Sequence, residues 1–173
     1  VLQRVKELEN QGYQFEAAEG SFRLLARRVL ETHQPLFTLE RFRVIVGKHG
    51  EQPPFAEAIV RVKVGEESLL FAAEGNGPVH ALDNALRKAL LRFYPELNDI
   101  ELTDYKVRVL EEEHGTASRV RVLIESTDHE DIWGTVGASE NIILASWEAL
   151  VDSLEYGVAL RREKAERKQP RPA

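Results

Sequence analysis

FTLERFRVIV, residues 37–46, alternates apolar and polar side chains, and IELTDYKVRV, residues 100–109, repeats the alternation 63 positions later. A period of two is typical of a β-strand that buries one face. Self-similarity at a fixed offset indicates a duplicated structural unit, so these stretches predict one strand used twice. The matched apolar positions are Leu39 with Leu102, Phe42 with Tyr105, Val44 with Val107, and Val46 with Val109.

The repeat extends beyond this strand. AEAIVRVKV (56–64) and SLLFAA (68–73) predict two more strands, and apolar residues at helical spacing predict a helix over 79–90. VRVKV (60–64) matches VRVLI (120–124), and Ala85-Leu86 matches Ala149-Leu150. Each half therefore reads strand, strand, strand, helix. A half of about sixty residues is marginal alone, so we expect the halves to share one core in a two-layer α+β sandwich made of a duplicated βββα unit.

An α-helical linker segment is expected before the first repeat. Leu2, Val5 and Leu8 have helical spacing that stops at Gly12. A second stripe steps by three and four, with charged residues expected on the wet face. The predicted organisation is a linker at 1–34, a main domain at 35–160 with repeats at 36–97 and 98–160, and a disordered basic tail at 161–173. The second stripe comprises Phe15, Ala18, Phe22, Leu25 and Val29, and its wet face Glu16, Glu19, Arg23, Arg27 and Arg28.

Composition narrows the class of protein. Hydrophobic residues make up 43 % of the 173 and charged residues 30 %, which is typical of a soluble globular protein, and no apolar run is long enough to span a membrane. A net charge of −6 argues against nucleic-acid binding. The absence of cysteine fits a reducing compartment, so we expect a cytoplasmic location. The absence of methionine and of a signal peptide predicts a piece of a longer protein.

No complete active site is visible in the sequence. The five histidines, at 33, 49, 80, 114 and 129, form no zinc-binding pair, and no nucleophile motif such as G-x-S-x-G occurs. GNGPVH (75–80) lacks the third glycine of a dinucleotide-binding loop and the lysine of a P-loop. The acidic run at 111–113 is interpreted as a solvated hairpin turn. We therefore expect no catalytic residue and no bound metal in this chain.

Two glycine-led helix starts are the most suggestive feature. GNGPVH (75–80) and TVGASEN (135–141) each precede a predicted helix. Free backbone N–H groups and the positive end of the helix dipole make such a start receptive to a carboxylate. For a single loop, turn geometry alone is a sufficient explanation. Two such loops in a chain without catalytic residues favour a small anionic or zwitterionic ligand.

Five blocks of sequence, in order, resemble the C-terminal part of the 2-isopropylmalate synthase / (R)-citramalate synthase family. GNGPV is shared across that family, whereas GYQFEAAE, DYKVRVL and GTAS are more similar to its citramalate-synthase-type branch. The likeness covers nearly the whole chain except the basic tail. The blocks are GYQFEAAEGSF (12–22), GNGPVHALDNALRKAL (75–90), DYKVRVL (104–110), GTASRVRVLIES (115–126) and WGTVGASENIILASWEALVDSLEY (133–156).

The resemblance implies a function for residues 35–160. Enzymes of this family condense acetyl-CoA with a 2-oxo acid in a TIM barrel that holds a divalent metal, and this barrel lies upstream of the matching part. The matching part is the end of a helical linker and a regulatory domain of two βββα units, which dimerises and binds the end-product amino acid for feedback inhibition. The implied partners are an amino-acid effector, isoleucine or leucine, and a second copy of the chain, with no nucleic acid, no membrane and no cofactor in this piece.

The resemblance also implies an effector site, with three contributions. The first is the GNG turn and the residues after it, the second is the strand that opens the second repeat, and the third is the next strand with the second helix start. His80 stands where an acidic residue can occur in relatives, and plain sheet core is the alternative for Tyr105, Val109 and especially Val107. The implied effector-binding residues are Gly75, Asn76, Gly77, Val79, His80, Leu102, Tyr105, Val109, Val120, Ser139 and Asn141.

Two alternatives remain beside the isoleucine-binding domain of a citramalate synthase. One is the leucine-binding domain of a 2-isopropylmalate synthase. It would have the same fold, and the side chain of its effector would branch at the γ carbon and not at the β carbon. The other is a dimerisation module with a vestigial pocket. The 2-oxo acid substrate cannot be read from this part of the sequence, because the family's substrate pocket is in the barrel.

Overall fold

The computed structural model describes residues 1–110 and 118–168 and divides the chain into two compact units. One unit is Gln34–Pro95, and the other combines Val1–His33 with Glu96–Ala173. The chain passes between the units after residues 33 and 95, within two or three residues of the expected limits of the first repeat. The acidic run at 111–113 lies outside the described residues.

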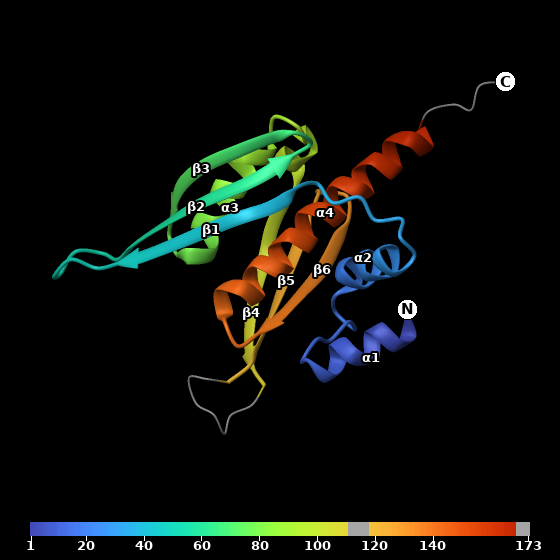
Figure 1. Ribbon diagram of the computed structural model, residues 1–173, viewed down its shortest axis with the longest axis horizontal. Coiled ribbons are helices and arrows are strands. Elements are labelled where there is room, and N and C mark those ends of the chain that lie inside the picture. Colours follow the sequence, from blue (N-terminus) through green and yellow to red (C-terminus); the bar gives the residue numbers. More distant parts are fainter. Residues whose placement is uncertain (111–117, 169–173) are drawn as a thin grey trace. The chain divides into compact units, whose positions relative to one another are not determined.

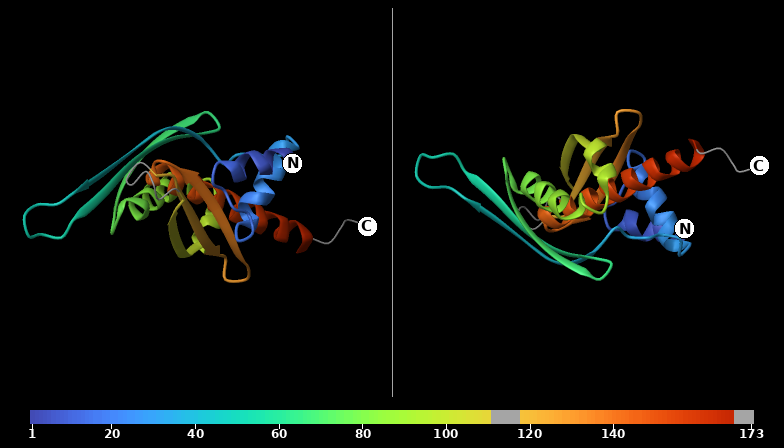
Figure 2. Two further views of the ribbon diagram at one scale, coloured as in Figure 1. Left: turned by 90° about the horizontal axis from the view of Figure 1, so that it is seen from below. Right: turned by 90° about the horizontal axis from the view of Figure 1, so that it is seen from above.

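The first unit is a three-stranded antiparallel sheet with one helix (Figure 1). Its strands β1 (Thr38–Gly47), β2 (Phe55–Val64) and β3 (Glu67–Gly75) lie in that order, and α3 (Pro78–Leu90) follows. Figure 2 shows α3 on one face of the sheet and the β1–β2 hairpin reaching past the helix. Val60 and Val62 on the sheet and Leu82 and Leu86 on α3 are fully buried, so this interface is the core of the unit.

The second unit repeats this plan. After the 3₁₀ turn η1 (Pro95–Asp99) come β4 (Glu101–Val109), β5 (Val120–Thr127), β6 (Ile132–Ser139) and α4 (Ile142–Lys168), with sheet order β4-β5-β6. Ala149 and Leu150 of α4 are fully buried, as are Ala85 and Leu86 of α3 at the matching positions. The duplicated βββα unit and the α+β class are therefore confirmed.

Even an irregularity of the sheet is repeated. The β1–β2 pairing shifts register between Leu39 and Arg41, and the β4–β5 pairing shifts between Leu102 and Asp104. The two shifts are 63 residues apart, the same offset that relates the two strands in sequence. A shift of one residue would otherwise turn every later side chain to the other face of the sheet, so its repetition keeps the apolar faces equivalent.

The N-terminal segment forms two helices, α1 (Leu2–Asn10) and α2 (Glu19–Val29), as expected, and Ala18 and Leu25 of the predicted stripe are buried. Phe22 and Val29 of the predicted stripe are 40 % and 41 % exposed. The buried face of α2 is therefore turned from the predicted one: it keeps Leu25 and adds Gly20, Ser21 and Leu24. Small residues are needed there because a Cβ on Gly20 would lie 2.9 Å from the carbonyl oxygen of Gly134.

The prediction of a solvent-exposed charged face on α2 is also partly wrong. Arg27 pairs with Glu163 and Arg28 pairs with Asp152, both on α4. Pairing partners more than 120 positions away in the sequence give no local signal. The charged side of α2 therefore contributes to its packing on α4, and is not simply solvated.

The second glycine-led helix start is a strand. Gly137 of the predicted helix start and the preceding Gly134 both belong to β6. Their function is close packing: a Cβ on Gly134 would lie 1.9 Å from the carbonyl oxygen of Ala17, and one on Gly137 would lie 2.0 Å from that of Ala145. These glycines admit neighbouring backbones and do not form a flexible loop.

The basic tail also requires correction, because α4 continues through residues 161–168. Residues 169–173 lie outside the described part of the chain. Within residues 1–110 and 118–168, no helix combines the length and the hydropathy needed to cross a membrane.

Candidate functional site

The start of α3 is an open helix terminus. Gly77 is its N-cap, no side chain caps the helix, and Pro78 supplies no N–H group. The amides of Val79 and His80, in the first turn, have no acceptor within the helix. The Nδ1 atom of His80 accepts a hydrogen bond from the Asn76 amide at 3.1 Å, which ties the turn to the helix. The available amides and the helix dipole suit a carboxylate.

Two glycines in this turn have different roles. A Cβ on Gly75 would lie 2.4 Å from the amide nitrogen of Ala81, so only glycine fits there. Gly77 has an extended backbone, with φ −162°, and a Cβ on it would meet nothing within 4 Å. Any residue can adopt that conformation, so Gly77 is not needed for turn geometry and leaves open space at the helix terminus.

The start of α4 is closed by a side chain. The Oδ1 atom of Asn141 accepts hydrogen bonds from the amides of Ile143 at 2.9 Å and Leu144 at 3.2 Å. The amide of Asn141 donates in turn to the Oγ atom of Ser139 at 3.1 Å. These are the amides that a ligand carboxylate would need, and they are already satisfied. Of the two helix starts, only that of α3 is open to an anion.

A half-exposed apolar strip lies on β4. Tyr105, Val107 and Val109 point to the same face of the sheet as buried Val122 and Ile124 of β5, but are 39–47 % exposed. The interpretation of Val107 as sheet core is therefore wrong for this chain. The Tyr105 hydroxyl lies 2.8 Å from the Oγ atom of Ser146, which joins this strip to the first turns of α4.

The predicted residues of the second unit gather only in part. Val109 pairs with Val120, which pairs with Ser139, so these three lie side by side across the sheet near Asn141. Leu102 pairs with Ser126 at the opposite end of β4, seven residues and roughly 20 Å from Val109. Gly75, Asn76, Gly77, Val79 and His80 gather separately, at the start of α3 in the first unit.

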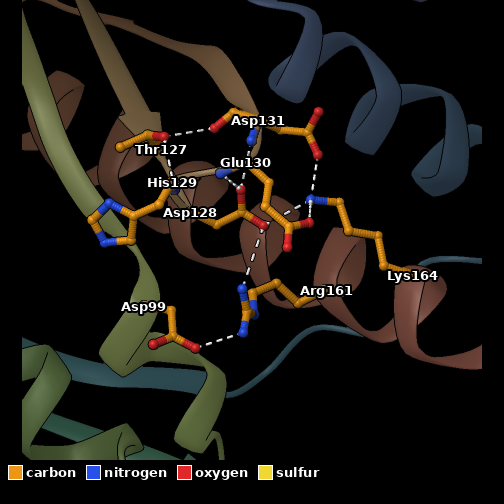
Figure 3. Close-up of polar contacts among 8 residues, drawn as sticks. All are labelled: Asp99, Thr127, Asp128, His129, Glu130, Asp131, Arg161 and Lys164. Carbon is orange, nitrogen blue, oxygen red and sulfur yellow. Dashed lines mark hydrogen bonds and ion pairs between the residues drawn. The ribbon is translucent and has the colours of Figure 1, made fainter. Parts of the chain in front are cut away.

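A buried carboxylate that sequence reasoning missed anchors the end of α4 (Figure 3). The Asp128 side chain is fully buried in the β5–β6 turn, where its Oδ1 atom accepts hydrogen bonds from the amides of Glu130 and Asp131. Its Oδ2 atom lies 2.9 Å from Lys164 and 3.6 Å from Arg161. Despite the opposing effect of burial, these donors lower the pKa of Asp128 to about 2. Arg161 and Lys164 therefore hold α4 in the region expected to be disordered.

A second ionic network joins α2 to the middle of α4. Arg28 contacts Asp152 at 2.6 Å and Glu155 at 3.2 Å, and His33 lies 3.1 Å from the same Glu155. Burial and the neighbouring Arg28 lower the pKa of His33, so its neutral form predominates at neutral pH. Every charge of this network has a partner within the network. Among residues 1–110 and 118–168, no group of three or more histidine, aspartate or glutamate side chains is arranged to hold a metal ion.

Comparison with known proteins shows which families and proteins this chain is similar to. Residues 16–158 match the family described as the LeuA allosteric (dimerisation) domain. The chain is 60 % identical over 157 residues to the (R)-citramalate synthase of Geobacter sulfurreducens and 50 % identical over 164 residues to that of Synechocystis. It is also 50 % identical over 157 residues to the (R)-citramalate synthase of Aquifex aeolicus. These matches cover at least 90 % of the chain, which spans about 30 % of the length of each relative.

Proposed function

The chain belongs to the LeuA allosteric (dimerisation) domain family, and from that premise we propose that it is the regulatory domain of an (R)-citramalate synthase. In this proposal it binds isoleucine, the end product, and so inhibits the condensation of acetyl-CoA with pyruvate elsewhere in the enzyme. The observation that carries the proposal is the 60 % identity to a citramalate synthase over 90 % of the chain. In this proposal, catalysis and its divalent metal belong to a part of the enzyme outside the residues that match here.

The open start of α3 supports binding of an amino acid. The amides of Val79 and His80, which have no acceptor within α3, suit the ligand's carboxylate, and Gly77 leaves space beside them. In the other unit, the half-exposed Tyr105 and Val109 of β4 form a separate candidate surface, whose apolar groups suit a branched side chain. Each group of residues can be tested separately.

Isoleucine and leucine differ only in the position of one methyl group. A fitted apolar pocket separates such isomers by roughly 1–3 kcal/mol, or about 10–200-fold in affinity. Ligand at about a hundred times its dissociation constant stabilises the folded state by roughly 2.7 kcal/mol, which raises the melting temperature by about 5–10 °C for a chain of this size. We expect the largest shift with isoleucine, a smaller one with leucine, and the smallest with valine, all at equal concentration.

Two variants locate the site. Gly77→Val fills the space at the helix start without backbone strain, and Val109→Thr makes the β4 strip polar at nearly constant volume. The variant in the unit that holds the site should lower isoleucine affinity, and both variants should keep the unliganded melting temperature within about 4 °C. Ser68→Val, which places the same side chain at the far end of β3, is the control and should bind like the parent. Parental affinity in both site variants would contradict the assigned site.

A larger shift with leucine would assign the chain to the 2-isopropylmalate synthase branch. No shift with any of the three amino acids would favour a dimerisation module with a vestigial pocket. Dimerisation itself is supported by the family and by the half-exposed apolar strip of β4, which a second copy could cover. Light scattering should give about twice the chain mass of 19.6 kDa at micromolar concentration.

A further inference from the structure

A cavity of about 600 Å³ lies within the second unit, between α1, α2 and α4. This volume is typical of small-molecule sites, which are mainly apolar with a few polar groups. Its apolar lining includes Leu8 of α1, Phe15, Leu25 of α2 and Trp147 of α4. None of the residues assigned above to the effector site lines it.

Glu148 is the carboxylate in this cavity that lacks a cation. It accepts hydrogen bonds from the Tyr13 hydroxyl at 2.7 Å and from the Ala138 amide at 3.4 Å, and both donors are neutral. Within residues 1–110 and 118–168, Glu148 forms no ion pair, and Arg119 acts on it only from a longer range. Burial, and to a lesser extent the nearby Asp152, raise the pKa of Glu148. A positive charge beside it would remove this cost.

The other charged groups of the cavity are already paired. Arg28 contacts Asp152 at 2.6 Å and also Glu155, and Arg4 contacts Glu7 at 2.9 Å. An anionic ligand would compete with these carboxylates for Arg4 and Arg28. A cationic ligand would find Glu148 without displacing any of them.

Aromatic rings strengthen the preference for a cation. The Tyr13 and Phe15 rings stack with centroids 6.1 Å apart, and Trp147 lies directly before Glu148 on α4. The faces of aromatic rings attract ammonium groups, and a carboxylate beside aromatic rings adds direct charge pairing. The same rings provide contact area for hydrocarbon.

We propose that this cavity binds a small organic ammonium ion, with its nitrogen at Glu148 and its apolar body against Phe15, Leu25 and Trp147. The proposal stands independently of the effector assignment, because it uses other residues and requires no carboxylate on the ligand.

The test is calorimetric titration of the chain with 2-phenylethylammonium and with its neutral analogue 2-phenylethanol. Charge-assisted pairing should make the ammonium bind at least about tenfold more tightly than the alcohol. Glu148→Gln keeps the shape of the side chain, and should abolish this preference while leaving alcohol binding unchanged. Asp104→Asn, which removes a carboxylate of β4 that pairs with Lys106, is the matched control and should retain the preference.

A second variant guards against misfolding of Glu148→Gln. Val29 lines the cavity and is 41 % exposed, so Val29→Arg should fold and should weaken ammonium binding by charge repulsion. Equal affinity for ammonium and alcohol in the parent chain, or binding of neither, would overturn the proposal. So would a preference for ammonium that survives in both Glu148→Gln and Val29→Arg.

Discussion

The two βββα repeats share their sheets more closely than their helices. Both sheets have the same strand order and the same register shift at positions 63 residues apart. The helices differ at both ends: α3 has 13 residues and no side-chain cap, whereas α4 has 27 residues and is capped by Asn141. The comparison teaches that a few polar side chains can change where a helix starts and how long it is, while the strand pairing of the duplicated sheet stays the same.

The largest effect should come from the glycines that hold each helix against its sheet. Gly75→Ala and Gly137→Ala each place a Cβ 2.4 Å or less from a backbone atom of the following helix. The backbone must shift in both, so each should lower the free energy of unfolding by about 3 kcal/mol. Urea denaturation measures this.

Gly77→Ala is the control for those substitutions, because its Cβ meets nothing within 4 Å. Its cost should not exceed about 1 kcal/mol, the usual penalty of alanine at an N-cap. If Gly75→Ala and Gly137→Ala cost no more than this control, close helix–sheet packing does not explain the glycines of either repeat.

The next effect concerns the anchor found only in the second repeat. The pKa of Asp128 is about 2 in the folded chain and near 3.8 when unfolded, so its carboxylate stabilises the fold above about pH 4. This contribution, about 2 kcal/mol, is lost as pH falls from 4 towards 2. Asp128→Asn should lack it at every pH, so the parent and the variant should differ at pH 7 and converge near pH 2.

Urea titrations at pH 7, 4 and 2 measure that convergence. Glu130→Gln removes a more exposed carboxylate of the same turn and should cost less than about 0.5 kcal/mol at pH 7. A difference between parent and Asp128→Asn that is independent of pH would show that packing, and not charge, anchors the end of α4.

The smallest effect distinguishes the two helix starts. Asn141→Ala removes the cap of α4 and should cost about 1 kcal/mol. Gly77→Asn supplies the missing cap of α3 and should stabilise the chain by a few tenths of a kcal/mol. Thermal unfolding monitored by circular dichroism would show shifts of opposite sign; shifts of the same sign would mean that capping does not distinguish the two starts.

Much of the fold could be predicted because its determinants are local. Alternation in residues 37–46 and 100–109 reports burial on one face of a strand, and both strands were located within a residue. The third strand of the second repeat was expected but not located, because glycines such as Gly134 and Gly137 are also typical of turns. Their cause is the approach of backbone near Ala17 and Ala145, which sequence spacing does not show.

The candidate site was less predictable, because most of its contacts join residues that are far apart in the sequence. The open start of α3 follows from Gly77-Pro78, which lack a capping side chain. By contrast, the pairing of Val109 with Val120 and Ser139 depends on strand register, and Leu102 lies at the other end of its strand. Glu148 is bonded by the neutral donors Tyr13 and Ala138 and not by a cation, and no local sequence pattern reveals these contacts.

The second unit is assembled from two separated stretches of chain, with the whole first unit between them. During synthesis the ribosome completes Gln34–Pro95 as one contiguous segment, so its strands and helix can pair with one another before the rest of the second unit is made. Leu24 and Leu25 of α2 must wait, since β6 and α4, against which α2 packs, are made more than a hundred residues later. The helices α1 and α2 are thus made well before the elements against which α2 packs, and its apolar face needs protection in the interval.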